Sequence, residues 1–299
     1  MLKIHREPFI QEIREDWILD KGLQLFIKRE DVIHPQVSGN KWRKLKYNLL
    51  EARNQGKSTL LTFGGAYSNH IYATAAAAAA AGYQSIGIIR GEELADKPLN
   101  QTLRFAVETC GMRLHFVTRE AYRKKNEADY INKLTEKFGS FYLIPEGGTN
   151  ALAIKGAQEI VDEKTKEFDV LALSVGTGGT VSGVISAAAT TQHVIGFSAL
   201  KGDFLIDEVK QLLEDNCKGR FTNWEIETNY HFGGYAKHTE VLVDFIKNFE
   251  DKHHIPIEPI YTGKMLFGLF DKIKQDHFPP RTKVLAIHTG GLQGKKIRD

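Results

Sequence analysis

A short basic segment, residues 38–45 (SGNKWRKL), combines a reactive amine with a second cation. Lys41 directly follows a Gly-Asn turn, and Lys44 comes about one helical turn later. This arrangement suits a lysine that forms a Schiff base with a carbonyl cofactor, followed by a cation for a phosphate. A basic helix start taken alone is usually a solvated surface, so the interpretation depends on the rest of the chain.

Two glycine-rich turns further along the chain favour a phosphate site. Residues 64–70 (GGAYSNH) follow the apolar run 60–63, and residues 176–180 (GTGGT) follow the apolar run 170–175. Both read as a strand, a tight turn and a helix N-terminus, where free N–H groups and the helix dipole attract an anion. No Gly-Lys-Ser/Thr follows the second turn, which excludes a Walker loop, and a dinucleotide fingerprint is poorly met.

Composition excludes several classes of protein. The 299 residues carry a formal net charge of +3, which does not indicate a nucleic-acid partner. Cys110 and Cys217 are the only cysteines, so a ribbon-type zinc site is excluded and we expect no metal. The first residues are too polar for a signal peptide, and no apolar run approaches the ~20 residues of a membrane span. We therefore expect a cytoplasmic enzyme with no membrane partner.

Apolar, β-branched runs alternate with segments of helical periodicity. This pattern indicates an α/β fold with parallel-type sheets covered by helices. The unbroken alanines 75–81 end at Gly82, a good C-cap, and predict a tightly packed helix. A further helix is predicted over 181–189. The predicted strands lie at about 23–29, 59–64, 85–90, 113–118, 141–145, 169–175, 193–199 and 283–288.

These blocks resemble the pyridoxal-phosphate enzymes of the tryptophan-synthase β-like type. Within that type they are most similar to the 1-aminocyclopropane-1-carboxylate deaminase and D-cysteine desulfhydrase family. The family has Gly-Asn-Lys-x-Arg-Lys, Gly-Gly-x-x-Ser-Asn and Thr-Gly-x-Thr blocks, then Tyr-x-Gly-Lys and His-x-Gly-Gly. This chain has the last two as 261–264 (YTGK) and 288–291 (HTGG). Five blocks in the same order span nearly the whole chain.

The resemblance implies a two-lobed α/β fold of type II and a pyridoxal 5'-phosphate cofactor. Residues 1–44 and 150–299 would form the large cofactor-binding domain, and residues 45–149 a smaller inserted α/β domain. The stretch 146–150 is the expected return hinge. A homodimer is also expected, although the sequence itself does not give the oligomeric state. The chain ends at Asp299, where relatives usually continue through another helix, so we expect a different lid or dimer contact.

The resemblance also implies which residues hold the cofactor. Lys41 forms the Schiff base and Lys44 approaches the phosphate, while Arg43 is left out as a structural salt-bridge residue. Asn69 bonds the phenolic oxygen, and Thr289 faces the pyridine nitrogen. A hydroxyl there leaves the nitrogen largely unprotonated, which favours prompt loss of a β-leaving group over a long-lived carbanion. The phosphate cup comprises Gly176, Thr177, Gly178, Gly179 and Thr180.

Other residues are assigned to the substrate. Ser68 lies beside the reacting carbon in the family, and it is also a good N-cap. Tyr261 would bind or protonate a leaving thiol, with Tyr235 as a helper. Either Lys41 or Ser68 handles the α-proton, and the sequence leaves both open. The remaining substrate contacts are Asn69, Tyr67, which stands where relatives usually have glutamine, and His70, whose position also favours the helix interior.

The implied reaction is β-elimination and deamination of a small amino acid, most like D-cysteine to pyruvate, ammonia and sulfide. Thr262 and Thr289 stand where the deaminases tend to have Glu and Leu. This difference favours a desulfhydrase over ring opening of 1-aminocyclopropane-1-carboxylate. The deaminase is the first alternative, followed by a β-replacement synthase and by a cofactor-holding protein with little turnover.

Overall fold

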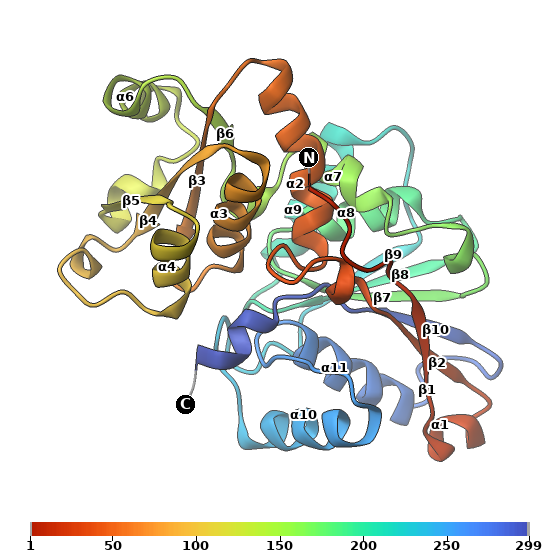
Figure 1. Ribbon diagram of the computed structural model, residues 1–299. Coiled ribbons are helices and arrows are strands. Elements are labelled where there is room, and N and C mark those ends of the chain that lie inside the picture. The colour runs from red at the N-terminus through yellow and green to blue at the C-terminus, as the bar shows by residue number, and fades with distance from the viewer. Residues whose placement is uncertain (1, 298–299) are drawn as a thin grey trace.

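The computed structural model describes residues 2–297, with only the backbone for residues 294, 296 and 297. The strands in this range are β1 (Ile10–Ile13), β2 (Gln24–Lys28), β3 (Thr59–Gly65), β4 (Gln84–Arg90), β5 (Arg113–Val117), β6 (Tyr142–Ile144), β7 (Val170–Val175), β8 (His193–Ser198), β9 (Trp224–Glu227) and β10 (Lys283–Ile287). A six-stranded sheet has the order β1-β2-β10-β7-β8-β9, and a four-stranded sheet has the order β5-β4-β3-β6 (Figure 1). Only β1 and β2 pair antiparallel; the other pairs are parallel.

All eight predicted strands are confirmed, each to within one residue at either end. The two strands that the sequence did not predict are β1 and β9. They lie at opposite edges of the six-stranded sheet and have four residues each. An edge strand packs against one neighbour only, and both segments mix polar with apolar residues, so neither has the continuous apolar run of a buried parallel strand.

The helices are α1 (Asp16–Asp20), α2 (Asn40–Asn54), α3 (Asn69–Ala81), α4 (Gln101–Arg104), α5 (Arg119–Arg123), α6 (Ala128–Phe138), α7 (Ala151–Gln158), α8 (Gly179–Ala187), α9 (Phe204–Asn216), α10 (Glu240–His253) and α11 (Thr262–Lys274). The alanine helix is confirmed as α3, and Gly82 ends it in the left-handed conformation with φ of 79°. Among the described residues, no helix is both long and apolar enough to span a membrane.

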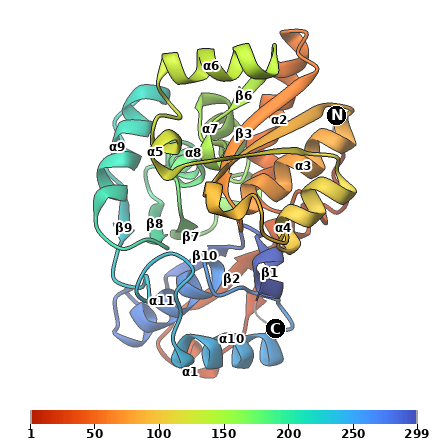
Figure 2. The ribbon, with the colours of Figure 1, turned by 90° about the vertical axis from the view of Figure 1, so that its left-hand side faces the viewer.

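The six-stranded sheet is covered on both faces. Along β7, Leu171, Leu173 and Val175 point to the face that packs against α8 and α9. Val170 and Ala172 point to the opposite face and pack with residues of α10 and α11. This alternation within one wholly apolar strand is typical of a parallel sheet between two helical layers, which Figures 1 and 2 show from two sides.

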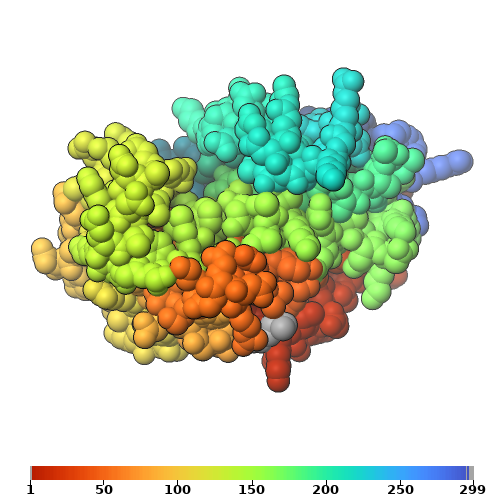
Figure 3. Space-filling view, turned by 90° about the horizontal axis from the view of Figure 1, so that it is seen from above, coloured from red at the N-terminus to blue at the C-terminus, as the bar shows by residue number. Residues whose placement is uncertain are grey.

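The four-stranded sheet forms the second lobe, with α3 on one face and α5 and α6 on the other. Its strands fall between residues 59 and 144, inside the predicted insert of 45–149. Helix α2 runs unbroken across the predicted first boundary and packs against α7, which places chain segments near residues 50 and 155 side by side (Figure 3). The two boundaries themselves remain a prediction.

Candidate active site

The glycine-rich blocks meet at the carboxyl ends of parallel strands. Strands β7 and β10 are neighbours, so the loop after Val175 and the loop after Ile287 lie side by side. The backbone N–H of Asn40 donates to the carbonyl of Thr289 at 3.0 Å. The Asn69 amide donates to the carbonyl of Gly291 at 3.5 Å. The carboxyl edge of a parallel sheet is where ligands bind in open α/β folds.

The close approach of two loops fixes the start of α2. Gly39 has φ of 58°, and a Cβ built there would lie 2.0 Å from the Thr289 carbonyl oxygen. On the other side, Gly290 has φ of 82°, and its added Cβ would lie 2.4 Å from Ser38 Oγ. No side chain fits at either position, and both conformations favour glycine. The Gly-Asn turn therefore holds Lys41 at a defined place beside the last block of the chain.

Lys41 lies in an environment that destabilises its ammonium form. Its Nζ is 3.4 Å from Asn40 Oδ1. Within residues 2–297 no carboxylate forms an ion pair with it. Burial lowers the pKa of Lys41 from 10.5 to about 8, because the ammonium form is poorly solvated there. An amine with this pKa can attack a carbonyl and exchange protons near neutral pH.

Lys44 is a buried lysine without an anion. Its side chain is 1% exposed, and its Nζ donates to Thr149 Oγ1 at 2.9 Å. No carboxylate in the described part of the chain pairs with it. Burial, and then the neighbouring Lys41 charge, lower the pKa of Lys44 well below its ordinary value. An isolated ammonium is costly to bury, so the site is suited to an incoming anion that would restore the charged form.

The loop after β7 forms a cup next to Lys44. Helix α8 begins at Gly179, and a Cβ there would lie 3.3 Å from Lys44 Nζ. The hydroxyl of Thr180 accepts a hydrogen bond from the Asn40 amide at 2.9 Å, and the hydroxyls of Thr177 and Thr149 are 2.7 Å apart. Free N–H groups of a helix start, hydroxyls and one buried ammonium match the chemistry of a phosphate. The predicted cup residues are thus brought together with Lys44.

Thr289 has a hydroxyl partner that the sequence analysis missed. Its Oγ1 lies 3.1 Å from Ser174 Oγ, at the adjacent carboxyl ends of β10 and β7, and both residues are buried. Ser174 precedes the glycine loop by two residues, and this spacing is the signal that could have pointed to it. The pair offers hydroxyls and no charge to a ring nitrogen.

The turn after β3 places three predicted residues at the start of α3. Ser68 is the N-cap, and its Oγ accepts from the backbone N–H groups of His70 at 3.2 Å and Ile71 at 3.3 Å. Asn69 reaches the last block, as described above. Tyr67 is 50% exposed on the same turn. Ser68, Asn69 and Tyr67 therefore share the dipole-positive end of α3, where a carboxylate would be favoured.

His70 lies behind the cup. Its Nε2 is 2.8 Å from Thr62 Oγ1, and this hydroxyl donates to the carbonyl of Ile144 at 2.8 Å, so the imidazole Nε2 must be the donor. Burial, and then the charges of Lys41 and Lys44, lower the pKa of His70 well below its ordinary value. The imidazole is therefore neutral and packed in the lobe interior, where it is not placed to contact a substrate.

Two tyrosines approach the cup from the large lobe. A Cβ on Gly176 would lie 3.0 Å from Tyr261 Cε1, so the Tyr261 ring lies over the cup loop. The ring of Tyr235 meets that of Tyr261 edge-on, with centroids 6.2 Å apart. Burial, and then Tyr235 and Glu258, raise the pKa of Tyr261 well above its ordinary value. The side chain of Tyr261 is thus a neutral phenol, and its hydroxyl can act as a hydrogen-bond donor.

Thr262 differs from its expected role. It is fully buried, and its hydroxyl bonds Glu258 Oε1 at 3.1 Å instead of facing the cup. The physical reason is the start of α11, where Glu258 also accepts the backbone N–H of Thr262 at 2.7 Å and that of Tyr261 at 2.9 Å. The expected effect on substrate choice therefore depends on Thr289 alone. No sequence motif around Glu258 would have identified it as the residue that caps α11.

Arg43 is confirmed as a structural residue. Its Nε and Nη2 donate to the two carboxylate oxygens of the buried Glu30 at 2.9 and 3.1 Å.

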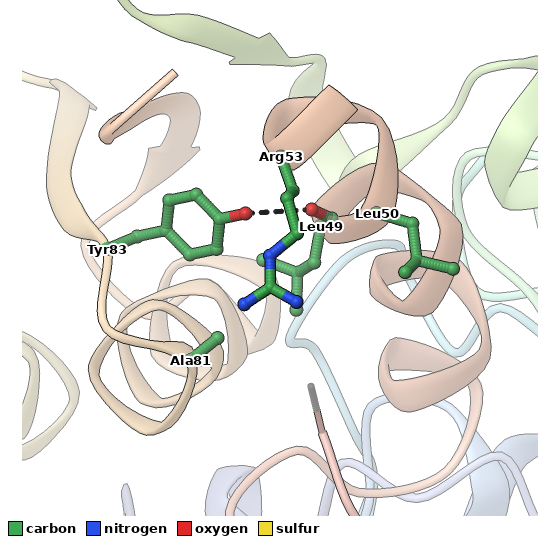
Figure 4. A pocket seen from close by; sticks show the side chains of 5 residues that line it. All are labelled: Leu49, Leu50, Arg53, Ala81 and Tyr83. Atoms are coloured by element: carbon green, nitrogen blue, oxygen red, sulfur yellow. Dashed lines mark hydrogen bonds between the residues drawn. The ribbon is translucent and has the colours of Figure 1, made fainter. Parts of the chain in front are cut away.

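A hollow at the far end of α2 is separate from the site (Figure 4). It is lined by Leu49, Leu50, Arg53, Ala81 and Tyr83. With a rise of about 1.5 Å per residue, Arg53 lies roughly 18 Å along the helix from Lys41.

Comparisons with known proteins identify the family and the fold. The family described as "Pyridoxal-phosphate dependent enzyme" matches residues 18–290. The bifunctional D-cysteine desulfhydrase/1-aminocyclopropane-1-carboxylate deaminase of Arabidopsis thaliana is 33% identical, over 92% of this chain and 74% of that protein. A putative 1-aminocyclopropane-1-carboxylate deaminase of Thermotoga maritima is 31% identical, over 96% and 93%. The crystal structure of an ACC deaminase homologue superimposes with a TM-score of 0.83 at 26% identity, over 98% and 92%. This chain belongs to the pyridoxal-phosphate-dependent enzymes and has their type II fold.

Proposed function

We propose that this enzyme eliminates the β-substituent of a small amino acid, most like D-cysteine, and releases pyruvate, ammonia and sulfide. The observation that carries the proposal is the pair of uncharged hydroxyls, Thr289 and Ser174, at the expected place of the pyridine nitrogen. A weak partner there favours prompt β-elimination over a long-lived carbanion. The name of the Arabidopsis relative supports both this reaction and ring opening of the cyclopropane acid.

The residues present fit pyridoxal phosphate. We propose that Lys41 attaches it, that Lys44 and the cup from Gly176 to Thr180 hold its phosphate, and that Asn69 bonds its phenolic oxygen. The support for the phosphate position is the buried Lys44 amine, which faces the first turn of α8 without a carboxylate among the described residues and which an anion would convert to the ammonium form. When bound, the cofactor supplies the electron sink for loss of the α-proton.

The protein's own groups divide the remaining work. We propose that the Lys41 amine, whose pKa is about 8, takes the α-proton, since a base works best near the operating pH. Ser68 is occupied as the N-cap of α3, and this end of the helix with Asn69 would bind the substrate carboxylate. Tyr261 would donate a hydrogen bond to the leaving sulfur. It would not protonate it, because its raised pKa lies above the ordinary thiol value of about 8.5.

A substrate screen tests the proposal. Purified enzyme is given D-cysteine, L-cysteine, D-serine and 1-aminocyclopropane-1-carboxylate separately, and released keto acid is measured. Pyruvate from D-cysteine, with sulfide in equal amount, is the expected result. Faster release of 2-oxobutyrate from the cyclopropane acid would replace the proposal by the deaminase. The deaminase is the second candidate because the Thermotoga relative carries that name.

Cofactor capture should depend on pH through Lys41. The cofactor-free enzyme should take up pyridoxal phosphate faster as the pH rises through about 8, because burial lowers the pKa of Lys41 to that value and only the neutral amine attacks the aldehyde. Rapid-mixing absorbance between pH 6 and 10 gives the rate. A midpoint near 10.5, the value of an exposed lysine, would show that another amine is the point of attachment.

Loss of the Lys44 ammonium should weaken cofactor retention. Lys44→Met removes a charged hydrogen-bond donor to the phosphate, which costs about 1.5–3 kcal/mol, or roughly ten- to a hundredfold in affinity. The matched control is Lys46→Met on the same helix, because Lys46 pairs with Glu159 away from the cup. Equilibrium dialysis against pyridoxal phosphate measures both. Equal retention by the two variants would place the phosphate elsewhere.

The assembly and the lobe boundaries are proposed from the resemblance. We propose a cytoplasmic homodimer, with residues 45–149 as the inserted lobe and residues 1–44 and 150–299 as the cofactor lobe. The division of the strands between two sheets supports these boundaries. Light scattering after size exclusion would give the mass of the assembly, and a monomer would refute the dimer.

A further inference from the structure

Lys264 is a further buried lysine, and the proposed reaction gives it no role. It is 1% exposed, and its Nζ donates to the backbone carbonyls of His231 and Gly234, each at 2.8 Å. The carbonyl of Ala199, just after β8, lies 3.5 Å away. Burial lowers the pKa of Lys264 to about 8, so the ammonium form still predominates at neutral pH. Its three N–H donors thus face three carbonyls of two separate segments.

Two of these carbonyls, those of His231 and Gly234, belong to a loop with an unfavourable backbone. Between β9 and α10, Phe232 has φ of 52° and Ala236 has φ of 57°, and Gly233 and Gly234 between them have φ of 90° and 115°. Residues with a Cβ rarely adopt such angles, and they persist only where surrounding contacts hold them. Lys264 bonds the carbonyls of this segment directly. Tyr235 is inside it, between Gly234 and Ala236.

The first turn of α11 connects this loop to the other tyrosine. Tyr261 is the N-cap residue of α11, and Lys264 follows it by three positions. Glu258 accepts the N–H groups of Ile260 at 2.7 Å and of Tyr261 at 2.9 Å, which fixes this turn. Residues three apart on a helix lie on the same side. One helix start therefore holds Tyr261 by its backbone and the Tyr235 loop by the Lys264 ammonium.

We infer that Lys264 is a positioning residue that holds the strained loop 231–236 so that the ring of Tyr235 meets Tyr261 at the reacting end of the substrate. Without the ammonium, the carbonyls of His231 and Gly234 keep only the turn's own backbone donors, at 3.0 and 3.2 Å, and the left-handed segment loses its link to α11. The inference rests on the proposed role of the two tyrosines with the substrate. It predicts that the effect of removing Lys264 passes through Tyr235.

A double-mutant cycle on the holoenzyme tests this prediction. Tyr235→Phe should lower kcat in the wild-type background, and Lys264→Met should lower kcat by about ten- to a hundredfold with little change in KM. In the Lys264→Met background, Tyr235→Phe should have almost no further effect, because the hydroxyl is already displaced. Two results would overturn the inference. One is a double variant whose loss of kcat equals the product of the two single losses; the other is a Tyr235→Phe variant with unchanged kcat.

The matched control is Lys272→Met. Lys272 is buried on the same helix, but its Nζ pairs with the carboxylate of Glu227 in β9 at 2.8 Å, and not with a carbonyl of residues 231–236. This variant should lose stability yet retain the full effect of Tyr235→Phe.

If Lys264→Met does not fold, Lys264→Gln serves in its place. It keeps an amide donor and should therefore lower kcat by a smaller factor. A Lys264→Gln variant with wild-type kcat and an undiminished Tyr235→Phe effect would also refute the inference.

A readout without substrate separates this inference from the proposed reaction. Hydrogen exchange of the peptide covering residues 231–237 is measured on the holoenzyme. Lys264→Met should speed its exchange severalfold, whereas Lys272→Met should leave it unchanged. Unaltered exchange in Lys264→Met would overturn the positioning role even if D-cysteine is the substrate. Faster exchange would support it even if the substrate screen finds a different amino acid.

Discussion

Replacement of Lys41 by alanine should reduce amino-acid turnover by a hundredfold to ten-thousandfold or more. The variant loses both the amine that attaches the cofactor and the proposed base for the α-proton, and base catalysis alone contributes about 10²–10⁴. The fold should be unaffected, because Lys41 Nζ makes only a weak contact of 3.4 Å with its neighbour Asn40. Turnover of D-cysteine and the melting temperature are measured together.

The control for this variant is Lys46→Ala on the same helix. Lys46 pairs with Glu159 and points away from the cup, so its removal should leave turnover within about twofold of wild type. Borohydride reduction followed by mass mapping should find the pyridoxyl group on Lys41 in wild type and in Lys46→Ala. A label on Lys44, or activity retained in Lys41→Ala, would refute the assignment of Lys41.

Gly39→Ala should destroy the site through the backbone alone. A Cβ at residue 39 would lie 2.0 Å from the carbonyl oxygen of Thr289, so one of the two loops must move. The hydrogen bond from the Asn40 N–H to that oxygen would be lost, and Lys41 would shift with it. We expect a stability loss of about 2–5 kcal/mol, from the left-handed φ and the overlap together, and the loss of covalently attached cofactor.

The chain provides a matched control in Gly56→Ala. Gly56 also has a positive φ, of 64°, but no atom lies within 4 Å of an added Cβ. It should therefore lose only the roughly 1–2 kcal/mol of the left-handed conformation and keep its cofactor. Denaturant unfolding and the cofactor absorbance compare the two variants. Equal losses in both would show that the contact between residue 39 and Thr289 is unimportant.

The positions of the strands and of the site loops were accessible from the sequence. Each of the long parallel strands is a continuous apolar run, because both its faces are covered, and such runs are readable without a structure. The two glycine-rich turns also predicted the starts of α3 and α8, since a turn followed by a helix start depends on local residues. Helix α8 begins at Gly179, two residues earlier than predicted, because the last two residues of the glycine-rich turn, Gly179 and Thr180, already belong to its first turn.

Contacts between distant segments were not accessible. Ser174 meets Thr289 across 115 positions because β7 and β10 are neighbours in the sheet, although 107 residues separate Val175 from Lys283 at their ends. Lys264 finds its two nearest acceptors 33 and 30 positions upstream. Neither contact produces a periodic pattern that could be recognised in a single sequence.

The direction of individual side chains was also beyond the sequence. For His70 the sequence left two placements open, a substrate contact in the turn or the helix interior, and the rotation of α3 points its ring to Thr62 and into the lobe. The motif after Tyr261 indicated an influence of Thr262 on substrate choice, but its hydroxyl completes the cap made by Glu258. In both cases one step along a helix, about 100°, separates a residue at the site from one behind it.

The most direct test is a competition between two substrates in one tube. Equimolar D-cysteine and 1-aminocyclopropane-1-carboxylate give different keto acids, pyruvate and 2-oxobutyrate, so the initial ratio of products equals the ratio of the two kcat/KM values. We expect pyruvate to predominate by at least tenfold, with sulfide in equal amount. An excess of 2-oxobutyrate would contradict it, and would show that an uncharged hydroxyl pair at Thr289 and Ser174 does not prevent ring opening.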